Sequence, residues 1–381
     1  MSLMSGQQPL DDWVSALRCP LDGDRLDLVD TATWRSRLGD VELVCRRSGT
    51  AQVPDVVLVR RDRPGAYPVL DGVPVLMAPE LLVPAGAVPP LRVDQAQYEE
   101  AYEEMAFYNA ASVEVTGDAL ADSREFRDVA RARTGDRGGL LVPSDAWLDE
   151  PFDALSQRDA YEHIAPVAGE RTLQLGGKGM HAVKFLLAGA AEAWLATPMY
   201  AEAEFAHELA ARFGVADRLR SVLCVAEELP FDDGFFGVVY SGSSVHHMVT
   251  ELAFPEIHRV LDTGGRFAAI DPFRAPMYGV GTRVFGKRDS VHCQPLTNER
   301  IAPLTDTFAD ARVEGHGALV RYPMLAFEKV AGYRPPMGRA LRIAETEDRV
   351  AQRLRVPDKW CSTVALLATK RPSDTPSHTA T

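Results

Sequence analysis

The side chains best suited to proton transfer lie directly after two predicted strands in the middle of the chain. His246 and His247 follow the apolar segment 236–241, and Asp271 ends a second apolar run. An imidazole at the mouth of a pocket can accept a proton from an attacking hydroxyl or amine, and a nearby carboxylate can orient a substrate. We predict these roles for the two histidines and for Asp271. The alternatives are that the histidines anchor a loop or helix start, and that Asp271, which precedes Pro272, simply ends a strand.

A glycine-rich turn follows the apolar segment 171–175 and precedes a predicted helix. The turn consists of Gly176, Gly177, Lys178 and Gly179. Glycines let the backbone approach a ligand closely, and the N-terminus of the following helix favours negative charge. Lys178 adds a cation there, which suits an anionic group; the alternative is that its ammonium group points to solvent. The sequence therefore predicts a ligand site at this turn.

These residues must be positioned by a sheet, because short apolar strands alternate with helices through the middle of the chain. Strands are predicted at 171–175, 193–196, 221–225, 236–241 and 265–270, and helices at 180–187, 201–213 and 251–261. Farther on we expect a helix at 298–309, a strand at 311–319, a helical insertion at 322–355 and an antiparallel last strand at 362–368. Such alternation predicts a doubly wound α/β fold with a mostly parallel sheet, whose ligands bind at the carboxyl ends of the strands.

Three further segments continue this order: Glu227–Phe236, Ser244–Met248, and Glu256–Leu261 followed by Gly264 and Gly265. Together they resemble the class I S-adenosylmethionine-dependent methyltransferases of the type 11 kind, over residues 166–275 and more weakly to the final strand near 370. The resemblance implies a Rossmann-like sheet, S-adenosylmethionine as the cofactor and a small-molecule acceptor. It also implies which residues hold the cofactor: Gln174, Gly176, Gly177, Lys178 and Gly179 at the methionine end, Ala226 and Glu227 near the adenine, and Ser241 after the fourth strand.

Several positions depart from the pattern of that family. It has acidic residues where Gln174, Leu195 or Ala196, and Val225 stand, and glycines where Lys178 and Met180 stand. A carboxylate facing a ribose diol accepts two hydrogen bonds, which no alkyl side chain replaces. Three functions therefore stay open. They are a methyltransferase acting on a small molecule in specialised metabolism, a repurposed enzyme with non-methyl chemistry or an anionic ligand, and a non-catalytic partner of another enzyme.

The N-terminal segment has its own resemblance. Cys19 is followed three residues later by Asp22, Cys45 by Ser48, and a strand pair is expected at 67–76. This arrangement resembles the small zinc-ribbon activator of tRNA and protein methyltransferases, which closes a tetrahedral site with two Cys-x-x-Cys knuckles. Each knuckle here keeps only its first cysteine. We therefore predict a metal-free ribbon held by apolar packing, with zinc binding as the alternative.

The chain divides by composition into five parts. We predict a degenerate ribbon over 1–84, a linker and helical lid over 85–165, the Rossmann-like core over 166–275, its C-terminal continuation with a substrate cap over 276–370, and a disordered tail over 371–381. Aromatic residues at helical spacing in 95–108 are expected to form the lid over the cofactor. The insertion 322–355 is expected to select the acceptor, and His292 and Cys293 to line the pocket or to bind a metal with the histidine pair.

Composition narrows the classes of function. The 381 residues carry a formal net charge of −13 and no basic face, which argues against nucleic acid as a partner. No apolar run reaches the roughly 18 residues of a membrane-spanning helix, and the N-terminus lacks the pattern of a secretory signal. Five cysteines without a Cys-x-x-Cys pair indicate free thiols. We expect a cytoplasmic protein with a small-molecule substrate; the sequence gives no sign of an oligomeric state.

Overall fold

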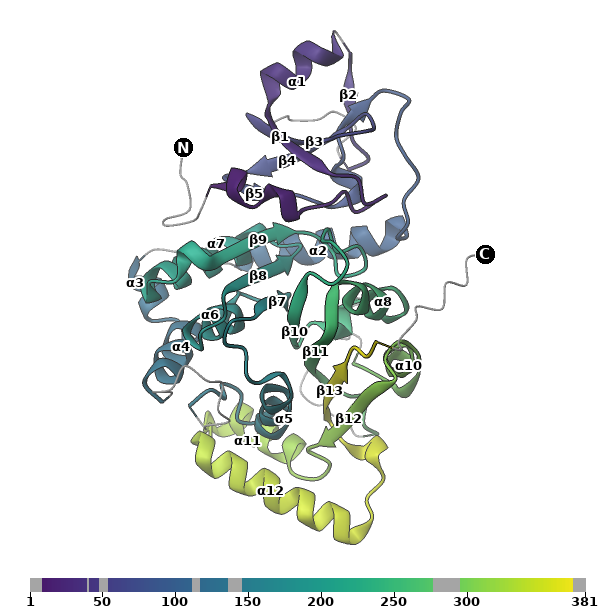
Figure 1. The fold of residues 1–381 in the computed structure, drawn as a ribbon. Helices are drawn as coiled ribbons and strands as arrows, with labels where there is room; N and C mark the ends of the chain where they lie inside the picture. The colour runs from purple at the N-terminus through teal and green to yellow at the C-terminus, as the bar shows by residue number, and fades with distance from the viewer. Residues whose placement is uncertain are drawn as a thin grey trace.

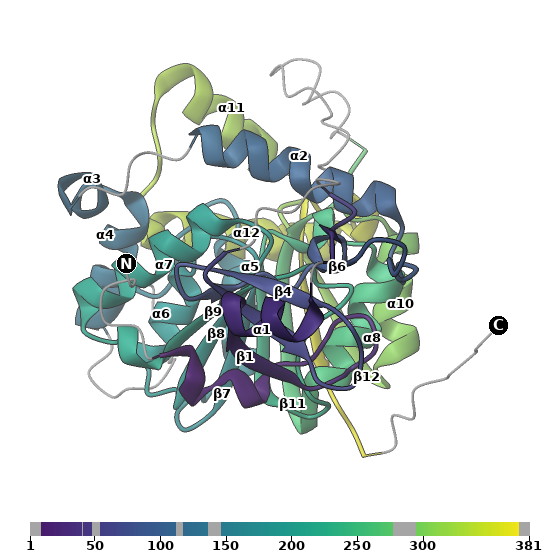
Figure 2. The ribbon, with the colours of Figure 1, turned by 90° about the horizontal axis from the view of Figure 1, so that it is seen from above.

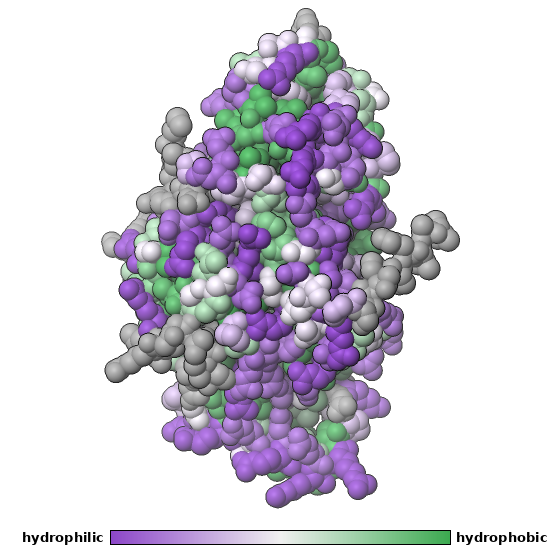
Figure 3. Space-filling model, in the orientation of Figure 1, coloured by the Kyte–Doolittle hydropathy of each residue, from purple (hydrophilic) through white to green (hydrophobic). Residues whose placement is uncertain are grey.

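The computed structural model describes residues 9–39, 41–47, 54–111, 117–135, 146–276 and 295–372. Figure 1 shows a small β-rich module at the N-terminal end and a larger α/β part, with helices α11 (Arg321–Ala331) and α12 (Met337–Leu354) at the far end. The face in Figure 3 is mostly hydrophilic over α12, whereas apolar groups gather over the N-terminal module. No helix within these ranges is both long enough and apolar enough to cross a bilayer.

The larger part is built on a seven-stranded sheet. Its strands are β7 (Arg171–Leu175), β8 (Glu192–Thr197), β9 (Leu219–Leu223), β10 (Phe236–Gly242), β11 (Leu261–Pro272), β12 (Asp310–His316) and β13 (Thr363–Thr369). Their order in space is β12-β13-β11-β10-β7-β8-β9, with β7 to β11 parallel and β13 antiparallel to both of its neighbours. The winding reverses between β7 and β10. The predicted fold class, a doubly wound and mostly parallel α/β sheet, is confirmed.

Helices cover both faces of this sheet. They are α4 (Arg124–Gly135), α5 (Ala154–Ile164), α6 (Met180–Leu187), α7 (Tyr200–Phe213), α8 (Thr250–Val260) and α10 (Asn298–Thr307). Successive strand residues point to opposite faces, so Trp194 of β8 joins the cluster that includes α8 and α10, whereas Leu195 packs against α6 and α7. Both faces are therefore buried, as expected of a parallel sheet.

The N-terminal module contains a four-stranded and a two-stranded antiparallel sheet. Its elements are β1 (Leu26–Asp30), α1 (Thr31–Leu38), β2 (Leu43–Val44), β3 (Val56–Arg60), β4 (Ala66–Leu70), β5 (Val73–Pro74) and β6 (Val83–Pro84). The module packs against the larger part: the Leu76 N–H donates to the Leu223 carbonyl at 2.7 Å, and Trp13 meets Trp194 edge-on at 5.3 Å. It thus covers part of the outer edge of β9, which would otherwise present unpaired backbone groups.

Candidate active site

A cavity of about 210 Å³, here called the first cavity, lies at the carboxyl ends of β7, β8 and β9. This is the place where ligands bind to a doubly wound sheet. Helix α2 (Gln95–Ala111) lies across it and contributes Gln97, Glu100 and Ala101 to the wall. The Gln97 amide donates to the His247 carbonyl at 3.3 Å. The predicted lid segment therefore lines the expected ligand site.

The glycine turn forms one wall of this cavity, and its glycines have different roles. Gly176 has φ +66°, and a Cβ there would lie 2.5 Å from the Ser244 Oγ, so no larger residue fits. Gly177 lines the cavity directly. Gly179, with φ +72°, instead lets α6 approach α7, because a Cβ there would lie 2.3 Å from the Cβ of Ala206. Of the three glycines in the turn, only Gly176 and Gly177 line the first cavity.

Gln174 and Lys178 are both engaged within the protein. The Gln174 side chain donates to the Gly176 carbonyl and accepts from the Ala182 N–H, each at 2.8 Å, and so holds the turn against the start of α6. The Lys178 ammonium lies 3.1 Å from the Glu125 carboxylate. This pairing weakens the case for a bound anion at Lys178, because much of its charge is already compensated.

Glu227 is a buried carboxylate in the wall of the first cavity, beside Ala226. One oxygen accepts from the Val249 N–H at 2.7 Å. Burial raises the pKa of Glu227 to about 7, and the nearby carboxylate of Glu228 adds to the shift, whereas the Val249 hydrogen bond opposes it. A carboxyl that is half ionised at neutral pH in a cavity is suited to accept hydrogen bonds from a ligand.

The end of β8 lacks the acidic residue that the resemblance to the family implies at Leu195 or Ala196. Leu195 packs against the helices, and Ala196 exposes only a methyl group. However, Glu202 in the first turn of α7 reaches the same wall and accepts from the Thr197 hydroxyl at 2.5 Å. Sequence reasoning missed this residue because it lies on the following helix and not at the strand end.

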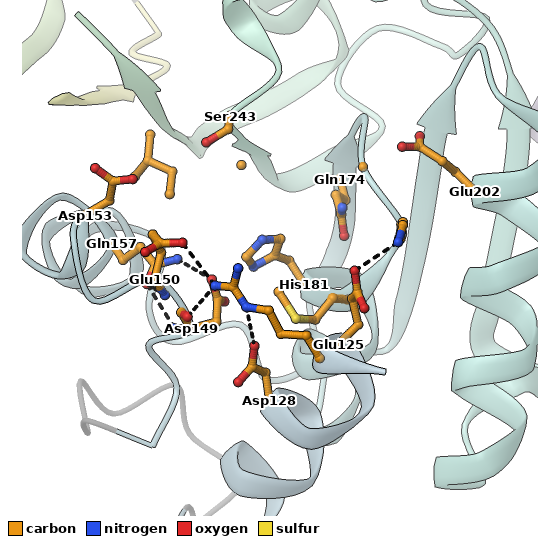
Figure 4. A pocket seen from close by; sticks show the side chains of 16 residues that line it. Glu125, Asp128, Asp149, Glu150, Asp153, Gln157, Gln174, His181, Glu202 and Ser243 are labelled. Atoms are coloured by element: carbon orange, nitrogen blue, oxygen red, sulfur yellow. Dashed lines mark hydrogen bonds and ion pairs between the residues drawn. The ribbon is translucent and has the colours of Figure 1, made fainter. Parts of the chain in front are cut away.

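A second cavity of about 300 Å³ adjoins the first and shares Gly177, Glu202, Gly242 and Ser243 with it. Figure 4 shows its polar wall, with Asp149, Glu150 and Asp153 on one side and Glu125 and Glu202 on the other. The remaining lining residues are Arg124, Asp128, Gln157, Gln174, Lys178, Met180, His181 and Ile270. Six of the sixteen lining residues are acidic. Gln174, Gly177 and Lys178 of the predicted ligand site also line this cavity, whereas no sequence motif had indicated its acidic residues.

The predicted catalytic residues separate into two groups. The His246 Nδ1 lies 2.6 Å from the Asp271 carboxylate, which also accepts from the backbone N–H groups of Val245 and His246. This arrangement supports the anchoring alternative for His246 and for Asp271, since neither is among the residues that line the two cavities. His247 does line the first cavity. Base catalysis by either histidine stays a prediction.

Ser241, the remaining predicted residue that the structure describes, lines neither cavity. Ser241 is fully buried in β10, and its neighbours Gly242 and Ser243 line both cavities in its place. His292 and Cys293 lie outside the described residues.

The candidate zinc ligands of the N-terminal module also have other partners. The Cys19 thiol lies 3.5 Å from the Tyr67 hydroxyl, and Asp22 is paired with Arg60 and, at 3.2 Å, with Arg63. Ser48 lies outside the described residues. Within the part of the chain that the structure describes, no three His, Cys, Asp or Glu side chains are grouped to hold a metal ion. The zinc-ribbon resemblance and its metal-free state stay predictions.

Comparison with known proteins bears on the part of the chain that forms this site. Residues 173–269, which run from within β7 to within β11, match the family model of the methyltransferase domain. A curated sterol 4-C-methyltransferase of Caenorhabditis elegans is 33% identical over 78 residues, which are 20% of this chain and 23% of that protein. The matched part thus spans less than a quarter of that relative.

Two solved structures align with this chain at low identity. The geranyl diphosphate C-methyltransferase of Streptomyces coelicolor A3(2), solved with Mg²⁺, geranyl diphosphate and S-adenosyl-L-homocysteine, is 18% identical with a TM-score of 0.46, covering 74% of this chain and all of that one. The [4+2]-cyclase SpnF is 19% identical with a TM-score of 0.42, covering 65% of this chain and 93% of that one. At these scores the similarity carries no argument about substrate or chemistry.

Proposed function

We propose that this protein is an S-adenosylmethionine-dependent methyltransferase that acts on a small molecule, with specialised metabolism as the predicted setting. The observation that carries the proposal is the first cavity, which lies at the carboxyl ends of the strands inside the methyltransferase domain and is walled by Gly176 and Glu227. The two adjoining cavities, of about 210 and 300 Å³, together fall within the ~300–1,000 Å³ usual for small-molecule sites.

The residues of the first cavity fit the parts of such a cofactor. The Glu227 carboxylate can accept from an adenine amino group, with Ala226 beside the ring. Glu202, held by Thr197, supplies the carboxylate for the ribose hydroxyls that the end of β8 lacks. Gly176 and Gly177 leave room for the methionine end. Bound S-adenosylmethionine supplies an electrophilic methyl group on a sulfonium; the protein then contributes mainly positioning.

Calorimetric titration with S-adenosylmethionine and S-adenosylhomocysteine tests the proposal. We expect both ligands to bind the unmodified protein. Gly176→Ala should weaken binding at least about tenfold, because the added Cβ forces the turn into the cavity. Gly264→Ala is the matched control: its φ is +83°, but no atom lies within 4 Å of the new Cβ. No binding of either ligand at millimolar concentration would contradict the proposal.

A repurposed enzyme is the second candidate, favoured by the apolar end of β8 and by a neutral Gln174 that is fully engaged in the glycine turn. Its anionic-ligand form is less well supported, since Lys178 is paired with Glu125. Titration with inorganic phosphate separates the two candidates. Phosphate binding that is lost in Lys178→Met, together with no binding of S-adenosylmethionine, would favour the second.

A further inference from the structure

We propose that the second cavity is the acceptor site, that it takes a neutral or cationic molecule rich in hydroxyl and amino groups, and that His181 accepts the proton released there. This inference rests on the proposed methyltransferase function and adds to it the class of substrate and a catalytic residue.

The carboxylates of the wall are held from behind by cations. Asp149 lies 2.7 Å from Lys184, Asp153 lies 2.8 Å from Arg321 at the start of α11, and Glu150 lies 2.9 Å from Arg334. They also have further partners, since Gln157 donates to Asp149 and Arg124 to Glu150. An ionised carboxylate has about four acceptor positions, so the remaining positions are available to a ligand. The wall is therefore a fixed array of hydrogen-bond acceptors.

Such an array selects against two classes of acceptor. A phosphorylated molecule would meet six acidic side chains, which outnumber the two lining cations Arg124 and Lys178, and would be repelled. A sterol-like or prenyl hydrocarbon would desolvate these carboxylates without replacing their hydrogen bonds, since only Met180 and Ile270 offer larger apolar contacts. Hydroxyl and amino groups instead donate to the carboxylates. The cavity thus fits an acceptor resembling an amino sugar in its polarity.

His181 faces this cavity from the first turn of α6 (Figure 4). Its Nδ1 lies 2.6 Å from the Tyr161 hydroxyl, and its ring packs against Tyr240 at 4.7 Å between centroids. On its other side the Nε2 lies 2.8 Å from the position that a Cβ on Gly242 would take. Gly242 belongs to both cavities, so the Nε2 lies at their junction.

The environment of His181 keeps its imidazole neutral, so the ring has a lone pair to accept a proton. Burial lowers the pKa of His181 to about 4, with Asp149 opposing the shift and Lys184 adding to it, so the imidazole is neutral at pH 7. In the tautomer whose Nδ1–H donates to Tyr161, the Nε2 presents its lone pair to the cavity. The nearby Asp149 charge then favours the imidazolium that forms.

Methyl transfer forms one bond, breaks one bond and moves one proton. The acceptor oxygen or nitrogen forms a bond to the methyl carbon while the carbon–sulfur bond breaks and its electron pair stays on sulfur. The proton of the acceptor moves to the His181 Nε2 and from there to solvent. Tyr161 is a positioning residue in this scheme, since it holds the ring and does not touch the acceptor.

Binding of matched probes tests the substrate class without turnover. With S-adenosylhomocysteine saturating, we expect calorimetry to detect glucosamine at about 10 mM and to detect no binding of glucosamine 6-phosphate or geranyl diphosphate. Glu150→Gln should weaken glucosamine binding severalfold, whereas the exposed Glu204→Gln on α7 should not. Binding of a phosphorylated probe in preference to glucosamine, or no binding of glucosamine, overturns the inference. Failure of S-adenosylhomocysteine itself to bind contradicts the proposed function instead.

Turnover of the bound probe tests His181. Release of S-adenosylhomocysteine should fall at least about 100-fold in kcat in His181→Gln, with glucosamine affinity and the KM for S-adenosylmethionine unchanged. Tyr161→Phe should lower kcat less and should also leave both affinities unchanged. A His181→Gln protein that keeps its kcat, a larger loss in His247→Ala, or a probe that binds but is never methylated overturns the inference.

Discussion

The buried carboxyl of Glu227 should make the protein less stable as the pH rises, and Glu227→Gln should remove that dependence. Burial raises the pKa of Glu227 from 4.5 to about 7 in the folded protein. Between these two values the unfolded chain releases the proton and the folded one keeps it, so the free energy of unfolding falls with increasing pH. The full penalty, reached above pH 7, is roughly 3 kcal/mol, since one pKa unit corresponds to about 1.4 kcal/mol.

The assay compares unfolding of Glu227→Gln and of the unmodified protein at pH 5 and at pH 8. Most of the penalty develops between these pH values, so the stability difference in favour of the variant should grow by about 2.5 kcal/mol. For a chain of this size that corresponds to roughly 3 °C in Tm. Glu204→Gln, an exposed change on α7, should show no such growth.

Two results would refute this reasoning. One is a stability difference between Glu227→Gln and the unmodified protein that is the same at pH 5 and at pH 8. The other is a difference that is larger at pH 5. Either result would mean that the Glu227 carboxyl is not desolvated in the folded protein, and its role beside the adenine in the first cavity would lose its support.

Three further predictions concern stability, each checked by denaturant unfolding. Burial alone would lower the pKa of His316, but the carboxylates of Asp159 and Asp348 raise it to about 9. The contribution of His316 to the free energy of unfolding should therefore be about 2.5 kcal/mol at pH 7 and should disappear by about pH 10. A His316→Gln cost that is equal at both pH values would contradict this. Asp149→Asn should lower the free energy of unfolding by about 3–5 kcal/mol, because it leaves the Lys184 ammonium buried and unpaired. Adding Lys184→Met should recover most of this loss. A double variant as unstable as the single one would show that the ion pair is not the cause. Gly179→Ala should lower the free energy of unfolding by about 1–3 kcal/mol more than Gly214→Ala, because both glycines have φ near +73° but only a Cβ at Gly179 meets another Cβ. Equal losses in the two variants would argue against close packing of α6 on α7.

The strands of the core were predictable where they are continuous apolar runs. The strand predicted at 236–241 runs from Phe236 to Gly242, because its phenylalanine, valine and tyrosine residues form a nearly continuous apolar run that is mostly buried. The third strand was predicted at 221–225 but runs from Leu219 to Leu223. The buried Arg220 breaks the apolar pattern at its start. Helix α1 was missed, since only Trp34 among its residues is buried and the segment has no helical apolar stripe.

The candidate site was predictable only where a motif is contiguous in sequence. The glycine turn and Glu227 both line the first cavity, as their positions after strands indicated. The acidic wall of the second cavity could not be predicted, because its carboxylates come from three separate parts of the chain, 124–128, 149–153 and Glu202, that only the folded chain brings together. His181 looked like any residue in a helical turn. Its importance depends on which way α6 faces, and tertiary packing decides that direction.

The contact between Leu76 and Leu223 has a practical consequence for work on this protein. A shortened chain that starts after Pro84 would keep every strand of the seven-stranded sheet. However, β9 would become an exposed edge strand, with which other copies of the protein could pair and aggregate. Such a fragment should precipitate during purification even if its cofactor-binding residues are intact. Such insolubility would result from the loss of the N-terminal module and would not mean that the larger α/β part is inactive.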